Sequence, residues 1–262
     1  MEYDIYQVDA FTDKLFNGNP ACVVPLKKWL DDSTLLNIAK ENAVPETAFF
    51  VKNDKNIHLR WFTPDIEMDL CGHATLATAH VIKKHLNNPS NILNFKTHSG
   101  EVNVEISKDK YFLDFPSRIP VKADLPINLE KSLNIKPKKV LKSRDFVLIY
   151  DKEEDIRNIK INRNTFDKID LGTGGVVVTA PGKNVDFVSR FFTPRATLLE
   201  DPVTGSAHCS LIPFWSSFFK KNKIEALQLS KRGGKLYCEN KTDRVLIGGN
   251  ARTFLKGKIQ IT

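Results

Sequence analysis

The chain has 262 residues, of which 41% are hydrophobic and 27% are charged, and its formal net charge is +8. This composition is typical of a globular protein with one large domain or two of ordinary size, and it excludes a disordered chain. No apolar run is long enough to cross a bilayer, and the first residues, Met-Glu-Tyr-Asp-Ile-Tyr, do not resemble a signal peptide. We therefore expect a cytoplasmic protein with no membrane partner.

The positive charge could indicate nucleic-acid binding, and the cysteines could indicate a metal site. The rest of the sequence supports neither function. The lysines occur in scattered pairs, such as Lys27-Lys28 and Lys138-Lys139, without a long basic block or a basic–aromatic RNA-binding motif. We therefore predict a lysine-rich surface and no nucleic-acid partner. The four cysteines lack CxxC spacing and have no histidine at zinc spacing, so we expect reduced thiols and no metal site.

The first half of the chain alternates predicted strands with few helices. Alternation predicts a strand over Tyr3–Ala10, and a second strand follows the turn signal Asn17-Gly-Asn-Pro20. Asp31-Asp-Ser33 predicts the start of a helix that runs to about Asn42. Further strands are predicted at residues 47–51, 57–62, 91–95, 101–106 and 111–115.

Glu46 lies where a loop enters one of these strands. A single glutamate at such a place is most often a surface turn residue. Here Val44 and Ala48-Phe-Phe50 flank it, and this apolar setting favours partial burial. A partly buried carboxylate is suited to general acid–base chemistry near neutral pH.

The segment Pro116–Pro120 has two prolines and no periodicity, and we predict that it joins two domains, residues 1–117 and 118–262. In the second domain we expect helical segments at 126–133 and 151–160 and strands at 139–141, 146–150, 176–180 and 185–192. A meander of turns and strands closes the chain. The glycine cluster Gly172-Thr-Gly-Gly175 matches neither a dinucleotide fingerprint nor a P-loop, so no nucleotide is expected.

One motif occurs twice, about 130 positions apart. Arg60-Trp-Phe-Thr-Pro64 leads into Asp69-Leu-Cys-Gly-His-Ala-Thr75, and Arg190-Phe-Phe-Thr-Pro194 leads into Asp201-Pro-Val-Thr-Gly-Ser-Ala-His208. A motif repeated across half the chain suggests two copies of one fold.

Each copy of the motif ends in a glycine turn followed by an apolar segment. Gly72 and Gly205 would then start buried helices, because a helix that is apolar on every side is buried. A helix N-terminus offers unpaired N–H groups and the positive end of the helix dipole to an anion. Taken singly, each helix could be an ordinary capped core helix. The duplication, with Asp, His and Ser at the turns, favours two anion sites that open into one cleft.

With these motifs in place, the chain resembles the PhzF family of phenazine biosynthesis-like isomerases nearly from end to end. The motifs that carry the resemblance are Val8-Asp-Ala-Phe11, Phe16–Ala21, Glu46–Phe49, Asp69–Thr75, Glu200–His208 and Lys231-Arg-Gly-Gly234. The resemblance implies an α+β, diaminopimelate epimerase-like fold of two similar domains, each a β-barrel-like sheet around a central helix. It also implies an active site in the inter-domain cleft, no cofactor and a homodimer.

The resemblance also implies roles for single residues. Glu46 matches the catalytic acid–base of the family, and His73 and Asp201 match residues that hold the polar groups of the substrate and assist proton movement. Gly72, Gly205 and Ser206 match the backbone and hydroxyl donors that bind the carboxylate of the substrate. We therefore predict a cofactor-independent isomerase that moves a proton on a small carboxylated substrate.

Three other interpretations stay open. A cofactor-free epimerase of amino or hydroxy acids needs two bases, and the related two-thiol epimerases carry a cysteine before each helix glycine. Here Cys71 has Thr204 as its counterpart, so we interpret Cys71 as a small buried residue. Ser206, with His73 and Asp201, weakly suggests a hydrolase. A non-catalytic module that binds a small acid or a protein would tolerate the loss of Glu46.

Overall fold

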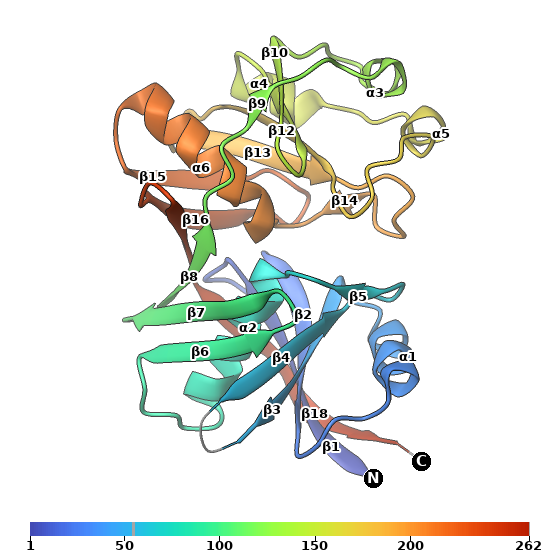
Figure 1. The fold of residues 1–262 in the computed structure, drawn as a ribbon, viewed down its shortest axis with the longest axis vertical. Helices are drawn as coiled ribbons and strands as arrows, with labels where there is room; N and C mark the ends of the chain where they lie inside the picture. Colours follow the sequence, from blue (N-terminus) through green and yellow to red (C-terminus); the bar gives the residue numbers. More distant parts are fainter. Residues whose placement is uncertain (54–55, 262) are drawn as a thin grey trace. The chain divides into compact units, whose positions relative to one another are not determined.

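The computed structural model describes residues 1–53 and 56–261. It divides into two compact units (Figure 1). Unit 1 comprises Met1–Phe115 with Leu246–Thr262, and unit 2 comprises Pro116–Val245. The expectation that residues 118–262 form one domain is therefore wrong for the C-terminal segment. The last strand, β18 (Ala251–Gln260), pairs antiparallel with the first strand, β1 (Glu2–Ala10), and this long ladder holds it in unit 1.

In its described residues, unit 1 is a mixed sheet with two helices. The strands pair in the order β18, β1, β2, β3, β4, β6, β7, β8, and the short β5 pairs with β4. The pairs β2–β3 and β4–β6 are parallel. The remaining bounds are β2 (Asn19–Leu26), α1 (Asp32–Asn42), β3 (Glu46–Lys52), β4 (Ile57–Phe62), β5 (Glu67–Met68), α2 (Gly72–Lys84), β6 (Ile92–Thr97), β7 (Gly100–Ser107) and β8 (Lys110–Pro116).

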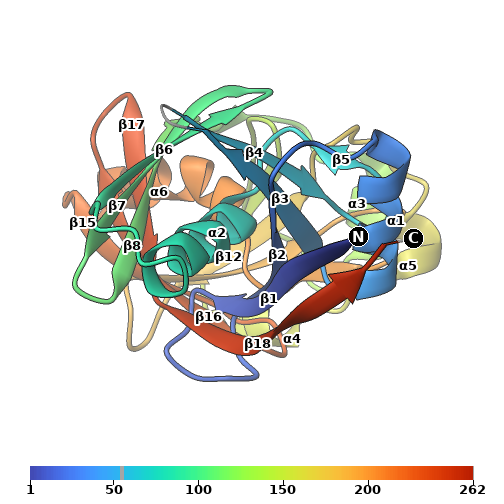
Figure 2. The same cartoon turned by 90° about the horizontal axis from the view of Figure 1, so that it is seen from below.

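The helix α2 is the centre of unit 1. Its residues from Gly72 to Ile82 are all buried, and it packs on β1, β2, β3 and β18. Figure 2 shows these strands around the helix. Small side chains such as Ala74, Ala77 and Ala79 allow strands to approach it on several sides.

Unit 2 has the same kind of architecture around α6 (Gly205–Phe219), in which residues 205–213 are all buried. The strands pair in the order β9, β10, β11, β12, β13, β15, β16, with β14 on β13. The remaining bounds are β9 (Val121–Lys122), α3 (Ile127–Ser132), β10 (Lys139–Lys142), β11 (Phe146–Ile149), α4 (Glu153–Asn158), α5 (Arg163–Phe166), β12 (Val176–Pro181), β13 (Phe187–Phe192), β14 (Glu200–Asp201), β15 (Lys223–Gln228) and β16 (Gly234–Asn240). The strand β17 (Arg244–Gly249) begins in unit 2 and continues into unit 1 from Leu246.

The two units repeat one topology. In unit 1 the strands β2, β3, β4, β6 and β7 pair successively as parallel, antiparallel, parallel and antiparallel. In unit 2 the strands β11, β12, β13, β15 and β16 pair in the same way. The helices α2 and α6 follow the short strands β5 and β14 in equivalent places. The predicted α+β class with two similar halves is therefore confirmed.

The repeated arginines have a structural role. Arg60 donates to the carboxylate of Glu67 from Nε and Nη2, at 2.7 and 2.6 Å, and so joins β4 to β5. Arg190 donates to Glu200 in the same way, at 2.6 and 2.9 Å, and joins β13 to β14. Such two-pronged pairs fix orientation as well as distance. Each pair therefore fixes the short strand that precedes a central helix.

Across residues 1–53 and 56–261, no helix is long and apolar enough to span a membrane.

Candidate active site

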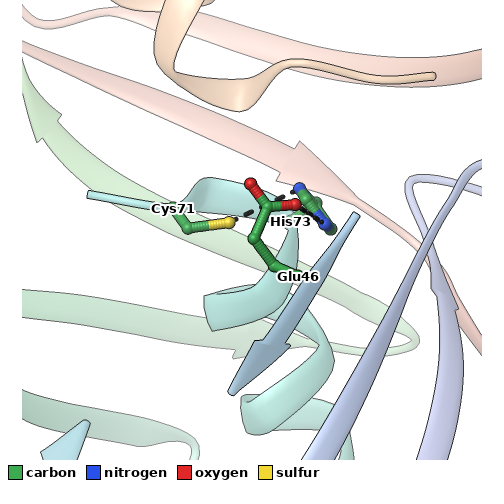
Figure 3. Close-up of side chains that lie close together, drawn as sticks. All are labelled: Glu46, Cys71 and His73. Atoms are coloured by element: carbon green, nitrogen blue, oxygen red, sulfur yellow. Dashed lines mark hydrogen bonds and ion pairs between the residues drawn. The ribbon is translucent and has the colours of Figure 1, made fainter. Parts of the chain in front are cut away.

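Three side chains of unit 1 meet at the start of α2 (Figure 3). Glu46 is the first residue of β3, Cys71 is the N-cap residue of α2 and His73 is the second residue of that helix. Nε2 of His73 lies 3.0 Å from Oε2 of Glu46. Nδ1 of His73 lies 3.5 Å from Sγ of Cys71. The two ring nitrogens thus face different partners.

The burial of this cluster fits acid–base chemistry. The side chain of His73 is 4% exposed and that of Glu46 is 15% exposed, so the carboxylate is partly buried, as its apolar flanks predict. Figure 3 shows one carboxylate oxygen directed at His73 and the other directed away from the imidazole. The two oxygens of the carboxylate therefore have different surroundings.

A fourth residue, Asn19, contacts the cluster. It is the first residue of β2 and is fully buried, and its Nδ2 lies 3.1 Å from Nδ1 of His73. The preceding Gly18 has φ +67°, and a Cβ there would lie 2.2 Å from the carbonyl oxygen of Ala10. Only glycine fits this turn. The sequence analysis predicted the turn but assigned no role to Asn19. A polar residue at the start of an apolar strand could have indicated a functional side chain.

Burial and charge set the protonation states of the cluster. Burial raises the pKa of the Cys71 thiol to about 11, and the charge of Glu46 adds to the effect, so the thiol is neutral near pH 7. Burial lowers the pKa of His73, but the charges and hydrogen bonds of Cys71 and Glu46 outweigh burial and raise that pKa well above its ordinary value. The charge of Cys71 acts only where the thiolate exists. Near neutral pH, Glu46 is the member of the trio whose charge raises the pKa of His73.

Glu46, Cys71 and His73 are also the donor types of a metal site, and their candidate ligand atoms lie within 4.8 Å of one another. A single metal ion takes one nitrogen of an imidazole. Here one ring nitrogen faces the thiol and the other faces the carboxylate. The imidazole thus lies between the two groups, which suits proton transfer better than coordination of one ion.

The two central helices begin without the side-chain cap that α1 has. Asp31 accepts a hydrogen bond from the amide of Thr34 at 2.9 Å and caps α1. In the described part of the chain, neither Cys71 nor Thr204 makes a side-chain cap bond at the start of α2 or α6. The first turns of α2 and α6 therefore lack the side-chain cap bond that Asp31 provides for α1. This difference favours the predicted anion sites over ordinary capped helices.

The remaining predicted residues lie in unit 2. Asp201, in β14, accepts a hydrogen bond from the hydroxyl of Thr204 through its carboxylate, and its carbonyl accepts one from the amide of Gln228 at 2.8 Å. Ser206 is the second residue of α6, equivalent to His73 in α2. The predicted residues thus fall into two groups: Glu46, Gly72 and His73 in unit 1, and Asp201, Gly205 and Ser206 in unit 2.

Sequence reasoning missed a cation beside Ser206. Nη2 of Arg144 donates to Oγ of Ser206 at 3.0 Å. Asp145, 2% exposed, holds the guanidinium through Nε and Nη2 at 3.1 and 3.0 Å, and Gly175 donates its N–H to the same carboxylate. The dipeptide Arg144-Asp145 directly before a buried strand was the signal in the sequence.

Comparisons with known proteins agree with this fold. A sequence model of the family described as phenazine biosynthesis-like protein, PhzC-PhzF, matches residues 8–257. An uncharacterized isomerase of Pseudomonas aeruginosa is 44% identical, with 100% of both chains covered. An uncharacterized isomerase of Halalkalibacterium halodurans is 40% identical over 99% of each chain.

Solved structures give the same result. The crystal structure of a PhzF family protein of Enterococcus faecalis matches with a TM-score of 0.95 and 44% identity, covering 100% of both chains. A hydroxyproline epimerase of Agrobacterium vitis, 10% identical, matches with a TM-score of 0.64 over 98% of this chain and 92% of its own, and so shares the fold. This chain therefore belongs to the PhzC-PhzF family of phenazine biosynthesis-like proteins, with the diaminopimelate epimerase-like fold, and is an isomerase.

Proposed function

We propose that this isomerase works without a cofactor and that Glu46 moves a proton between two carbon atoms of a small carboxylated substrate. The observation that carries the proposal is the partly buried carboxylate of Glu46, held 3.0 Å from His73 at the uncapped start of α2. A carboxylate fixed in this way is suited to take a proton and to return it.

The proposed reaction is balanced within one substrate. The oxygen of Glu46 that does not face His73 removes a proton from carbon, and the electron pair left behind enters the conjugated system of the substrate. The resulting carboxylic acid then returns the proton to another carbon, so that a double bond shifts and no oxidant or reductant is needed. N–H groups at Gly72 stabilise the negative charge that develops, and such fixed donors are often the largest catalytic contribution.

Residues of unit 2 take binding roles in the proposal. Because Oγ of Ser206 accepts a hydrogen bond from Arg144, the hydroxyl proton of Ser206 is free to bind an anion. The positive charge of Arg144 and the N–H groups at Gly205 also favour a carboxylate. Asp201 is proposed to hold a polar group of the substrate and to assist proton movement, and this role rests on the motif resemblance.

The cluster favours a proton shift over inversion. Inversion at carbon needs acid and base groups on opposite faces of the substrate. Glu46, Cys71 and His73 offer atoms within 4.8 Å of one another, so they would meet a bound molecule from one side. A shift along one face needs only one such group. The hydrolase interpretation gains no support, because the partner of Ser206 is Arg144, which cannot act as a base.

Proton NMR in heavy water tests the proposal. Wild type and Glu46→Gln are each incubated with a panel of small unsaturated and amino acids that includes 2,3-dihydro-3-hydroxyanthranilate. We expect deuterium incorporation or a shifted double bond with wild type only, and turnover of the anthranilate would extend the proposal to phenazine biosynthesis. Inversion at carbon would support the epimerase. Tight binding of an acid by both proteins without any exchange would support a binding module.

The proposal includes a homodimer, as the family resemblance implies, and a cytoplasmic location, as the first residues and the lack of a long apolar run predict. Light scattering coupled to size-exclusion chromatography measures the mass in solution directly. A mass of one chain at micromolar concentration would contradict the dimer without affecting the proposed chemistry.

A further inference from the structure

The segment between β8 and β9 lies against the helix α6 (Figure 1). Pro213 of that helix has no N–H, so the carbonyl of Cys209, four residues earlier, has no helical donor. The amide of Arg118 donates to this carbonyl at 2.9 Å instead. The preceding amide, that of Ser117, donates to the carbonyl of Asp243 at 2.8 Å. The backbone of Arg118 is therefore fixed beside α6.

The guanidinium of Arg118 has no partner for its charge. Its Nη1 atom is buried without a hydrogen-bond partner, and no carboxylate in residues 1–53 and 56–261 forms an ion pair with it. By contrast, Arg60, Arg144 and Arg190 have side chains that are 12, 19 and 15% exposed, and each pairs with a carboxylate of this chain. A buried donor without an acceptor is costly. An anion from outside the chain would supply the missing acceptor.

The same side of α6 holds a second arginine. Ser206, Cys209 and Ser210 are three and four positions apart, so they lie on one side of the helix, which we call the serine face. Nη2 of Arg144 donates to Oγ of Ser206 at 3.0 Å, and Oγ of Ser143 lies 2.6 Å from Oγ of Ser210. Arg144 is therefore held against the serine face from the side of the chain that precedes β11.

The charges at the serine face fit one singly charged anion. Asp145 binds the guanidinium of Arg144 through two nitrogens and offsets its charge. Arg118 has no such carboxylate, so one positive charge is left unbalanced. Burial raises the pKa of the Cys209 thiol to about 11, and the charges of Arg118 and Arg144 oppose this rise, which places both cations near one thiol. That thiol is neutral near pH 7 and adds no negative charge.

We propose that Arg118 is a substrate-binding residue whose guanidinium pairs with the carboxylate at the serine face, and that the substrate carries this one carboxylate and no further anionic group there. Arg144 and Ser206 add hydrogen bonds to the carboxylate, whereas Arg118 supplies the unbalanced charge. This inference rests on the proposed function in taking the bound carboxylate as that of the substrate.

The way in which Arg118 is held suits this role. Its backbone is bonded to α6, so little freedom is lost when an anion binds. Burial has already removed water from Nη1, so binding gains a hydrogen bond there without a further desolvation cost for the donor. The planar guanidinium can also present two parallel N–H groups to the two oxygens of a carboxylate.

Proton–nitrogen NMR of the arginine Nε–H groups tests the inference in the free protein, with acetate as the probe at about pH 6, where carboxylates are ionised. The signals of Arg118 and Arg144 are assigned by their loss in Arg118→Lys and Arg144→Met. Acetamide is the uncharged comparison, and sulfate is the doubly charged one. Arg157→Gln is the matched control, because it removes one positive charge from α4 of the same unit, where the side chain is 55% exposed.

We expect acetate to shift the Arg118 signal until the shift saturates. Acetamide should leave the signal unchanged, and sulfate should bind more weakly than acetate. Arg118→Gln, followed at the Arg144 signal, should bind acetate about tenfold more weakly or worse, because a charge-assisted hydrogen bond is lost. Arg157→Gln should bind acetate as wild type does. With the substrate of the enzyme, Arg118→Gln should raise KM by a similar factor with little change in kcat.

An Arg118 signal that does not respond to acetate, or that responds equally to acetamide, would overturn the inference. Tighter binding of sulfate than of acetate would also overturn it, as would unchanged acetate binding in an Arg118→Gln protein that circular dichroism shows to be folded. If that variant does not fold, the wild-type titration decides alone. Failure of the proposed function would appear separately, as normal turnover by Glu46→Gln while acetate still binds at Arg118.

Discussion

The helices α2 and α6 begin in the same way and carry different chemistry. In α2 the hydroxyl of Thr75 donates to the carbonyl of Cys71 at 2.6 Å. In α6 the equivalent residue, His208, contacts the carbonyl of Thr204 through Nδ1 at 2.8 Å. At the second position of the helix, however, His73 stands in one unit and Ser206 in the other.

The strands beside these helices show where the chemistry differs. The strand β3 begins with Glu46, whereas its topological equivalent β12 begins with Val176. Unit 2 has the cation of Arg144 beside its helix instead. The duplicated scaffold thus keeps its Arg–Glu pairs and its glycine turns. Proton transfer is proposed for unit 1 and anion binding for unit 2.

The two structural arginines offer the largest expected effect on stability. Arg190 also donates to the carbonyls of Ile156 and Ile159, at 3.1 and 2.9 Å. The further partner of Arg60 is Asp32, which is 77% exposed. Arg190→Leu should therefore lower the free energy of unfolding by about 3 kcal/mol, because it leaves the partly buried carboxylate of Glu200 and two backbone carbonyls unpaired, and Arg60→Leu should lower it less. Urea denaturation measures the free energy of unfolding of both variants. A larger loss for Arg60→Leu than for Arg190→Leu would contradict this prediction.

Each central helix also buries a neutral histidine, which predicts a pH dependence. Burial lowers the pKa of His80 and of His208 to about 4, and His85, Lys84 and Arg252 add to the effect at His80. The unfolded chain takes up these protons near pH 6.5. The stability is therefore complete above about pH 6.5 and falls towards pH 4, by up to about 1.4 kcal/mol per pH unit for each histidine.

Thermal unfolding between these pH values checks this dependence. His80→Gln and His208→Gln should each reduce the slope of stability against pH by the equivalent of one proton, since each removes one group that charges only in the unfolded state. Equal slopes in wild type and both variants would show that other groups control the acid sensitivity.

The smallest expected effect concerns anion binding in unit 2. Ser206→Ala and Arg144→Met should each raise the KM for a carboxylated substrate by about tenfold, with little change in kcat, because each removes uniform binding. Lys142→Met, which removes a positive charge from the adjacent strand β10, is the control and should leave KM unchanged. A fall in kcat with unchanged KM would assign these two residues to proton transfer instead.

Local sequence patterns predicted the helices and strands better than the contacts between them. The duplication, the cap of α1 at Asp31 and the place of Glu46 at a strand entry could all be predicted from nearby residues. The strand β15 was missed, because Lys-Ile-Glu-Ala-Leu-Gln consists mostly of good helix formers and becomes a strand by pairing with β13 and β16.

Contacts between distant segments were beyond sequence reasoning. The strand β18 was assigned to the wrong half, because nothing in its own residues shows that it pairs with β1. Asn19 reaches His73 across 54 positions, and Arg144 reaches Ser206 across 62. Such contacts depend on the tertiary structure, so a sequence pattern within one segment does not predict them.

The proton-transfer role of Glu46 is tested most directly by the rate of deuterium incorporation into the substrate, measured against substrate concentration for wild type and Glu46→Gln. We expect the rate at saturation to fall by at least ~10²-fold in the variant. The half-saturating concentration should stay the same, because the carboxylate of the substrate is bound elsewhere. A normal rate at saturation in Glu46→Gln would contradict the assignment of proton transfer to unit 1.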